Sequence, residues 1–332
     1  MPVPSTMLVP LFVGGGRITF GEKPVPAPAS GQLLVQVKAN ALCGSERGQF
    51  HGGSSVTPGH EAAGVVAAAG PDTHTPVGTP GVLFLMDFCG ACRSCRLGCT
   101  NQCEAKRADM GFTHGGGYGP YELVHENIFF PVPDDIPLTE ATLLLDIMGT
   151  GGHALARAQA VRPDIESLLV AGAGPIGLGV LAMAKLLFGA DLPVFITDTI
   201  PYRLALAEKL GGIPVPLPAS SLPTVDAAVD TSGKEAARRS ALSALSQRGV
   251  LVCVGHGEGL MLDVSPDLIA TERAVLGSEY FRFDELPANL ERLRAHREYL
   301  APIITHRFPV GEIQAAFGTF FGGQTGKVII EQ

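Results

Sequence analysis

A glycine-rich segment at Gly172–Gly177, with the sequence GAGPIG, constrains the fold of this chain more than any other feature. It follows the apolar run Ser167–Ala171 and precedes an apolar stretch with helical character, so it lies between a predicted strand and a predicted helix. In that position the glycines allow a tight turn and let a pyrophosphate approach the helix N-terminus. The sequence therefore predicts a dinucleotide site that includes Gly172, Gly174, Pro175, Ile176 and Gly177.

Apolar strands alternate with helices from Leu168 onward. Strands are predicted at 168–171, 194–198, 226–230, 250–255 and 274–276, and the helices between them at 175–187, 203–210 and 236–246. Such alternation is typical of parallel βαβ units with both sheet faces covered. We expect an α/β fold with a doubly wound parallel sheet in this part of the chain.

Asp198 ends the strand after the glycine-rich loop. A carboxylate at this distance can accept hydrogen bonds from both ribose hydroxyls, which favours NAD over NADP. Arg203 lies close by and is also assigned to the cofactor site. It fits a solvated arginine at a helix start, and it could also meet a 2′-phosphate, although Asp198 would repel that group.

The first part of the chain reads as mostly β. A hairpin and an extended segment are expected within 11–30, and strands at 33–39, 62–70 and 82–85, separated by Gly/Pro turns. This pattern predicts a barrel-like or partly open sheet. Further along, helices are expected at 139–145, capped by Thr139, at 152–159 and at 286–296, and a final strand at 327–330.

Four cysteines follow the spacing C-x2-C-x2-C-x7-C, namely Cys89, Cys92, Cys95 and Cys103. Four thiolates this close together can form a closed tetrahedral shell around zinc, as in structural sites. An iron–sulfur cluster is the alternative, but no flanking Cys-Pro run accompanies the set. Cys99 could compete as a ligand and fits better in the loop that leads to Cys103.

A second set of zinc-type ligands is less compact. Cys43, His60 and Glu61 offer a thiolate, an imidazole and a carboxylate, but Cys43 and His60 are separated in sequence and nothing local brings them together. On these residues alone, a buried cysteine and a turn histidine are the default interpretation, ahead of a metal site.

Together, these motifs resemble the zinc-dependent medium-chain dehydrogenase/reductase family, which includes alcohol, polyol and threonine dehydrogenases. The motifs are Cys43-Gly44-Ser45, Gly59-His60-Glu61, the four-cysteine lobe, GAGPIG with Asp198, and the ending Gly326-Lys327-Val328-Ile329. The resemblance implies a groES-like catalytic domain at 1–149 and 281–332, with a structural-zinc lobe at about 88–104. It also implies a Rossmann domain at 150–280 and an active site in the cleft between the domains.

The resemblance also implies a catalytic zinc held by Cys43, His60 and either Glu61 or Asp146, and hence two zinc ions per chain. Ser45 would pass a proton outward. Glu140 is a weaker competitor for the last ligand position, and a helix cap is the alternative role for Asp146. Where many relatives have Asp after the cysteine motif this chain has Glu46, and at a position where many carry His it has Gly48. His51, further along, would take over that role or lie in a surface loop.

The implied reaction is hydride transfer between a secondary alcohol or polyol and NAD. A threonine or formaldehyde dehydrogenase-like activity is the first alternative, because Asp146 resembles those branches. A non-catalytic NAD(P)-binding protein or a zinc-free quinone reductase is the alternative of another class. The substrate would be lined by Ser45, residues 48–51, Phe112, Tyr280 and Phe281.

The composition of the chain limits its number of domains, its partners and its cellular compartment. The 332 residues are 46% hydrophobic, which is enough for two domains, and the formal charge of −8 disfavours a nucleic-acid partner. The proline-broken start has no basic and apolar secretory pattern, and the clustered cysteines favour metal over disulfides, so we expect a cytoplasmic protein without a membrane partner. A homodimer or homotetramer is expected from the resemblance.

Overall fold

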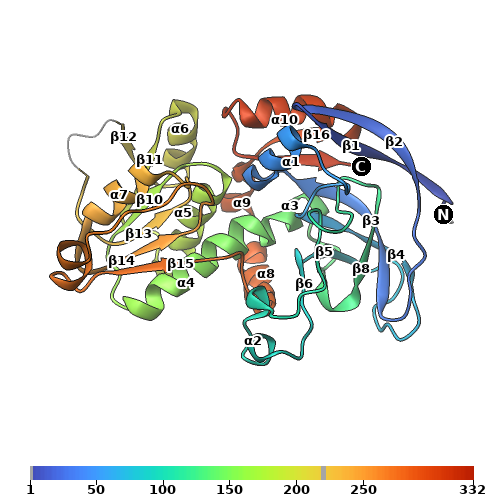
Figure 1. The fold of residues 1–332 in the computed structure, drawn as a ribbon, viewed down its shortest axis with the longest axis horizontal. Helices are drawn as coiled ribbons and strands as arrows, with labels where there is room; N and C mark the ends of the chain where they lie inside the picture. The colour runs from blue at the N-terminus through green and yellow to red at the C-terminus, as the bar shows by residue number, and fades with distance from the viewer. Residues whose placement is uncertain (1–2, 218–221) are drawn as a thin grey trace.

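A six-stranded parallel sheet forms the core of one half of the molecule (Figure 1). The structure, a computed structural model, describes residues 3–217 and 222–332. The strand order is β12-β11-β10-β13-β14-β15, which confirms the doubly wound parallel sheet. The strands are β10 (Leu168–Ala171), β11 (Val194–Asp198), β12 (Ile213–Pro216), β13 (Val225–Asp230), β14 (Leu245–Cys253) and β15 (Ala274–Gly277).

Helices cover both faces of this sheet. In β10, Leu168 and Val170 belong to the same core cluster as Leu178 of α5, whereas Leu169 packs with Leu242 of α7 on the other face. This alternation follows from the two-residue period of a strand. The helices of this half are α4 (Gly151–Val161), α5 (Pro175–Phe188), α6 (Pro201–Lys209) and α7 (Glu235–Ser243).

A seven-stranded sheet, largely antiparallel, organises the other half of the molecule (Figure 1). Its order is β16-β17-β3-β4-β5-β9, with β8 also paired to β3. Strands from both ends of the chain meet in it, since Ile329 near the C-terminus pairs with Ala41. The strands are β3 (Gln32–Ala41), β4 (Ala62–Ala69), β5 (Pro80–Leu83), β8 (Tyr121–His125), β9 (Phe129–Pro131), β16 (Ile304–Pro309) and β17 (Lys327–Glu331).

Smaller elements complete this half. The predicted hairpin is present but begins before residue 11, as β1 (Thr6–Gly14) and β2 (Arg17–Pro24). β6 (Met86–Asp87) pairs with β7 (Ala108–Asp109). The helices are α1 (Arg47–Gly52), α2 (Arg93–Arg96), α3 (Leu138–Ala141), α8 (Leu286–Ala295), α9 (Arg297–Leu300) and α10 (Ile313–Phe321). Within 3–217 and 222–332, no helix combines the length and the apolar character needed to cross a membrane.

Several local predictions were wrong in detail. Thr139 does not cap a helix, because α3 begins one residue earlier, with Pro137 at its cap position. The helix predicted to end at residue 246 stops at Ser243, since β14 begins at Leu245. β12 was missed because its sequence IPVP carries two prolines; it lies at the sheet edge, where a missing N–H is tolerated.

Candidate functional site

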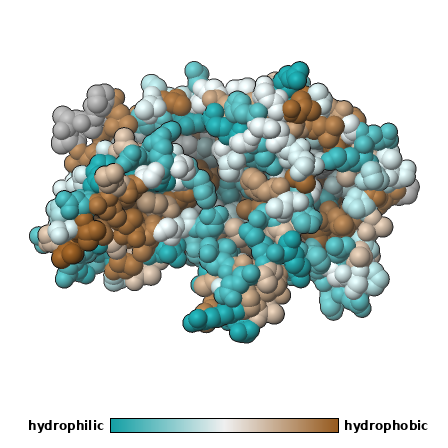
Figure 2. Space-filling view, viewed as in Figure 1, coloured by the Kyte–Doolittle hydropathy of each residue, from teal (hydrophilic) through white to brown (hydrophobic). Residues whose placement is uncertain are grey.

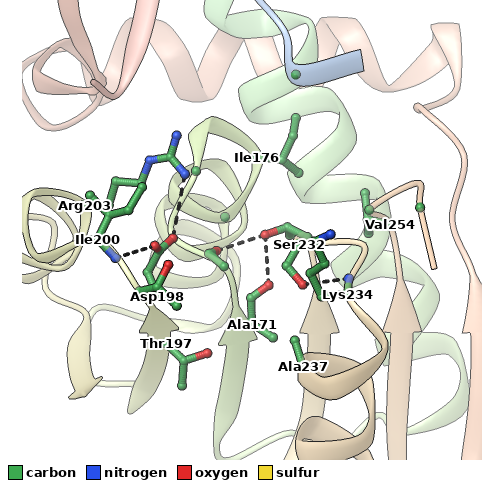
Figure 3. A pocket seen from close by; sticks show the side chains of 18 of the residues that line it. Ala171, Ile176, Thr197, Asp198, Ile200, Arg203, Ser232, Lys234, Ala237 and Val254 are labelled. Carbon is green, nitrogen blue, oxygen red and sulfur yellow. Dashed lines mark hydrogen bonds and ion pairs between the residues drawn. The ribbon is translucent and has the colours of Figure 1, made fainter. Parts of the chain in front are cut away.

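A cleft of about 1330 Å³ runs between the two halves of the molecule. The parallel-sheet half lines it with the glycine-rich loop and the ends of β11 and β13, and the other half with Cys43, Ser45 and Arg47. It therefore lies at the carboxyl ends of the parallel strands, where β10 and β13 form the switch point of the sheet. Figure 3 shows its walls, with Asp198 and Arg203 on one side and Ser232 and Lys234 on the other.

The glycine-rich loop has the backbone geometry that its sequence predicts. Gly172 has φ +103°, a conformation that L side chains rarely adopt, and Gly174 caps α5, whose first residue is Pro175. A Cβ on Gly177 would lie 1.8 Å from the Gly172 carbonyl oxygen. Gly177 is thus required for the close packing of α5 against the loop, and the amides at the start of α5 are available to a pyrophosphate.

Gly177→Ala is expected to abolish or strongly weaken NADH binding, because the loop must move to admit the methyl group. Titration of NADH fluorescence measures this. Gly318→Ala is the matched control, since Gly318 lies within helix α10 and nothing would lie within 4 Å of the added methyl group. Normal NADH affinity of Gly177→Ala would contradict this reading of the loop.

Asp198 is fixed at the edge of the cleft by backbone amides. The Ala173 N–H donates to its Oδ2 at 2.8 Å, and the Ile200 N–H donates to its Oδ1 at 2.8 Å. Arg203 lies beside it, with Nη1 3.9 Å from Oδ2 (Figure 3). Only 19% of the Arg203 side chain is exposed, so it lines the cleft instead of extending into solvent.

A second cluster lies where the cleft meets the β-rich half. The sulfur, nitrogen and carboxylate oxygens offered by Cys43, His60, Glu61 and Asp146 all lie within 4.8 Å of one another. Cys43 follows β3, His60 and Glu61 directly precede β4, and Asp146 begins the π-helix η5 (Asp146–Thr150). The fold therefore brings together the residues that the sequence left far apart.

The residue before His60 is glycine for a steric reason. Gly59 has φ +104°, and a Cβ there would lie 2.7 Å from the Tyr118 amide nitrogen. The turn that directs His60 toward Cys43 thus requires a residue without a side chain.

The donor set fits a zinc ion. A thiolate, an imidazole and carboxylates are the ligands that zinc takes in proteins. His60, Glu61 and Asp146 are all buried, and Glu61 Oε2 has no hydrogen-bond partner among the described residues. A buried carboxylate oxygen without a partner is costly, and a bound cation would satisfy it.

Protonation in this cluster depends on the neighbours. Burial lowers the pKa of His60, but hydrogen bonds to Cys43 and Glu46 outweigh it, so the pKa lies well above its usual value. Burial raises the pKa of Glu61, and nearby Asp146 raises it further. Since ligation requires neutral imidazole and ionised carboxylate, zinc binding here is expected to release protons.

Glu46 supports His60 from behind. His60 Nδ1 lies 3.1 Å from Glu46 Oε1, and the Tyr118 hydroxyl donates to Glu46 Oε2 at 2.6 Å. A carboxylate only accepts, so Nδ1 carries the proton and Nε2 is left for a metal. Glu46, one methylene longer than the aspartate of many relatives, therefore still reaches the His60 ring.

Lys327 is the buried residue for which the sequence predicted no role. It has no exposed surface, and its ammonium donates to Glu61 Oε1 and lies 3.8 Å from Asp146 Oδ2. Opposite charges hold the pKa of Lys327 above its usual value against the effect of burial. Its only signal in the sequence was its place in the Gly326-Lys327-Val328-Ile329 ending.

Other predicted residues lie around this cluster or outside it. Ser45 is exposed in the cleft, and the Phe112 ring lies 5.0 Å from that of His60. Glu140 pairs with Arg297 at 2.9 Å and does not belong to the cluster. His51 is exposed on α1, which agrees with a surface position.

Cys89, Cys92, Cys95 and Cys103 offer sulfur atoms that all lie within 4.8 Å of one another. Backbone N–H groups of Cys95 and Glu104 lower the pKa of Cys92 to about 6, whereas burial and hydrogen bonds to neighbouring cysteines raise that of Cys95 to about 12. A divalent cation would stabilise all four as thiolates. Cys99 lies outside the set, and its thiol donates to the Leu97 carbonyl at 3.9 Å.

The four-cysteine lobe holds the segment 279–283. Asn101 Nδ2 donates to the Glu279 carbonyl at 2.7 Å, and the Phe283 N–H donates to Thr100 Oγ1 at 2.9 Å. Within this segment Phe281 packs on Gly149 of η5, where an added Cβ would lie 2.4 Å from the ring. The lobe therefore supports, through this segment, the π-helix that carries Asp146.

Comparison with known proteins agrees with this architecture. Residues 29–134 match the alcohol dehydrogenase GroES-like domain, and residues 175–295 match the zinc-binding dehydrogenase family. An L-threonine 3-dehydrogenase of Deinococcus deserti is 30% identical over 338 residues, covering 92% of this chain and 93% of that protein. The chain belongs to the zinc-dependent medium-chain dehydrogenase/reductase family.

Further relatives extend the likeness over the whole chain. YphC of Escherichia coli, described as an uncharacterized zinc-type alcohol dehydrogenase-like protein, is 27% identical over 98% of this chain and 99% of its own. The structure of acetophenone reductase from Geotrichum candidum in complex with NAD superimposes with a TM-score of 0.88 at 23% identity, covering 100% of this chain and 99% of that one. The groES-like and Rossmann fold class is thus confirmed, and the family is one of nicotinamide-dependent oxidoreductases.

Proposed function

We propose that this member of the family is a zinc-dependent dehydrogenase that transfers a hydride between a secondary alcohol or polyol and NAD. The observation that carries the proposal is the position of Cys43, which belongs to the cluster of zinc-type donors and also lines the cleft that contains the glycine-rich loop. A substrate hydroxyl in the cleft would meet both the metal site and the cofactor. We propose catalytic roles for Cys43, Ser45, His60, Glu61 and Asp146.

The chain's own residues divide the work. When bound, zinc would supply a Lewis acid that lowers the pKa of a nearby hydroxyl toward neutrality. Ser45 is exposed in the cleft two residues after Cys43, and we propose that its Oγ passes the hydroxyl proton to solvent. The loop at Gly172–Gly177 would hold the pyrophosphate and orient the cofactor along the cleft.

The structural role belongs to the second zinc site. We propose that Cys89, Cys92, Cys95 and Cys103 hold one zinc in a closed shell without an open position, because all four donors come from the protein. This gives two zinc ions per chain. We place the catalytic domain at 1–149 and 281–332 and the Rossmann domain at 150–280.

The substrate class rests on the names of relatives together with the site. L-threonine 3-dehydrogenase and acetophenone reductase are names that imply chemistry at a secondary alcohol or its ketone. A threonine dehydrogenase-like activity is therefore the second candidate, favoured by Asp146 in the cluster. A panel of secondary alcohols, polyols, L-threonine and formaldehyde with glutathione, followed by NADH absorbance, tests the proposal. Turnover of none of them by protein that carries both zinc ions would contradict it.

The cofactor preference rests on Asp198, and this gives a prediction. Asp198→Ala is expected to lower kcat/KM with NAD by about 10-fold or more, because hydrogen bonds to the ribose are lost, and to shift the preference toward NADP, because the repulsion of the 2′-phosphate is lost. Steady-state kinetics with both cofactors measure the change. Asp164→Ala is the control, since Asp164 is exposed and lies outside the cleft. An unchanged cofactor ratio would refute the role of Asp198.

We also propose a homo-oligomer, a dimer or a tetramer. Figure 2 shows hydrophobic surface at the end of the parallel-sheet half. Exposed apolar side chains in the segment before β15 include Met261, Val264 and Ile269, which are 77%, 53% and 69% exposed. β15 is an edge strand of the same half, and among the residues that the structure describes no strand pairs with its outer side. A second copy could cover this surface, and light scattering measures the oligomeric state.

A further inference from the structure

Lys327 is a fully buried lysine beside Glu61 and Asp146, and it has no role in the reaction proposed above. A buried ammonium is costly unless it is paired, and its partners here are the two carboxylates of the cluster. Among the described residues, no other acidic side chain lies within ion-pair distance of its Nζ.

Lys327 is the first residue of β17, the last described strand of the chain, and this strand positions it beside Glu61. β17 pairs with β3 in the register Ile329 to Ala41, and the Leu42 N–H donates to the Val328 carbonyl at 2.9 Å. β3, which ends two residues before Cys43, is therefore hydrogen-bonded to β17, which begins at Lys327. The backbone of Lys327 thus belongs to the sheet, and its side chain reaches Glu61 from there.

The charges of the cluster show what the lysine is needed for. Thiolate from Cys43 and carboxylates from Glu61 and Asp146 bring three negative charges, and a zinc ion brings two positive ones. One negative charge would be left in a buried site, and Lys327 compensates it. The Glu46 carboxylate behind His60 is not part of this count; it is hydrogen-bonded by His60 and Tyr118.

The two carboxylate oxygens of Glu61 have different surroundings. Oε1 accepts from Lys327, and Oε2 is buried without a partner among the described residues. An ammonium that holds one oxygen orients the other, in the way that outer partners orient metal ligands.

We propose that Lys327 is a positioning residue of the catalytic zinc site, which orients Glu61 through Oε1 and compensates the charge that two carboxylates and a thiolate leave around the ion. The inference rests on the proposed zinc site. It predicts that Lys327 acts on metal retention through Glu61, whereas a lysine that only joins β17 to the core would affect stability and leave zinc affinity unchanged.

The experiment compares Lys327→Met, Glu61→Gln and the double variant with the wild type. Zinc per chain is measured by mass spectrometry after dialysis against a series of chelator concentrations. The two zinc ions are distinguished by the chelator concentration that removes each of them. Lys327→Met is expected to keep the zinc of the four-cysteine lobe and to bind the other zinc about 10- to 100-fold more weakly. In the Glu61→Gln background, removal of the lysine is expected to have a clearly smaller effect, since its main partner is already neutral.

Two results would overturn the proposal. One is a Lys327→Met protein that retains both zinc ions with wild-type resistance to chelator. The other is an equal fold-change on removing the lysine with and without the Glu61 carboxylate. If Lys327→Met alone does not fold, Glu61→Gln and the double variant are compared, and an additional large loss of zinc in the double variant overturns the inference.

Control measurements distinguish a failure of the proposed role of Lys327 from a failure of folding or of the proposed function. NADH binding by fluorescence reports whether the parallel-sheet half is intact in each variant. Lys185→Met is the matched lysine control, because its Nζ donates to the carbonyls of Ala190 and Leu192 and lies outside the cluster. No substrate is needed for the zinc measurement. A wild type that holds both zinc ions but oxidises no alcohol would remove the proposed function and leave the role of Lys327 standing.

Discussion

His60→Ala protein is expected to lose NAD-linked alcohol oxidation by about 1,000-fold or more while it keeps the zinc of the four-cysteine lobe. The reason is that a Lewis acid at a developing negative charge contributes several kcal/mol, and each 1.36 kcal/mol is about tenfold in rate. His60 supplies the only nitrogen of the cluster at Cys43, Glu61 and Asp146. Steady-state turnover and zinc content of the same preparation provide the measurement.

The matched control for this variant is His74→Ala. The His74 side chain is 93% exposed, and it contacts Glu126 on the surface. Cys43→Ala is expected to behave as His60→Ala does. Wild-type turnover of either cluster variant would show that the reaction does not use this site.

Cys92→Ser is expected to lose the zinc of the lobe and to lower the melting temperature by roughly 5–10 °C. Metal binding in such lobes contributes to folding free energy, and a loss of several kcal/mol corresponds to about this shift in a chain of this size. Calorimetry together with metal analysis measures it. The catalytic zinc is also expected to become easier to remove, because the lobe holds the segment 279–283 against η5.

Cys99→Ser provides the control within the same lobe. Its sulfur lies outside the four-cysteine set, so zinc content and melting temperature should stay at wild-type values. Loss of zinc in Cys99→Ser but not in Cys92→Ser would show that the ligands have been assigned wrongly.

Local motifs made much of the fold predictable. The glycine-rich loop is recognisable because the two positions that must be glycine for steric reasons, Gly172 and Gly177, are only five residues apart in the sequence. The four cysteines lie within one short loop, so their sulfur atoms cannot be far apart. β10 was the clearest strand of the parallel sheet because all four of its residues, Leu168–Ala171, are apolar and buried.

Contacts between distant segments were not predictable in the same way. Lys327 is 266 positions from Glu61, and its basic side chain gives no sign in the sequence that it will be fully buried. Asp146 was expected from a resemblance, but its place at the start of a π-helix depends on how η5 packs against Phe281. The metal-ligand residues of the cluster could be predicted from the sequence. The contacts that hold them in place could not, because these contacts depend on tertiary packing.

The number of zinc ions bound to wild-type protein purified without chelator tests the proposed catalytic zinc site more directly than any variant does. We expect two zinc ions per chain, one released by moderate chelator together with NAD-linked activity and one retained until the protein unfolds. One zinc per chain that resides in the four-cysteine lobe of an active enzyme would contradict the central claim, because the cluster at Cys43, His60, Glu61 and Asp146 would then hold no metal during turnover.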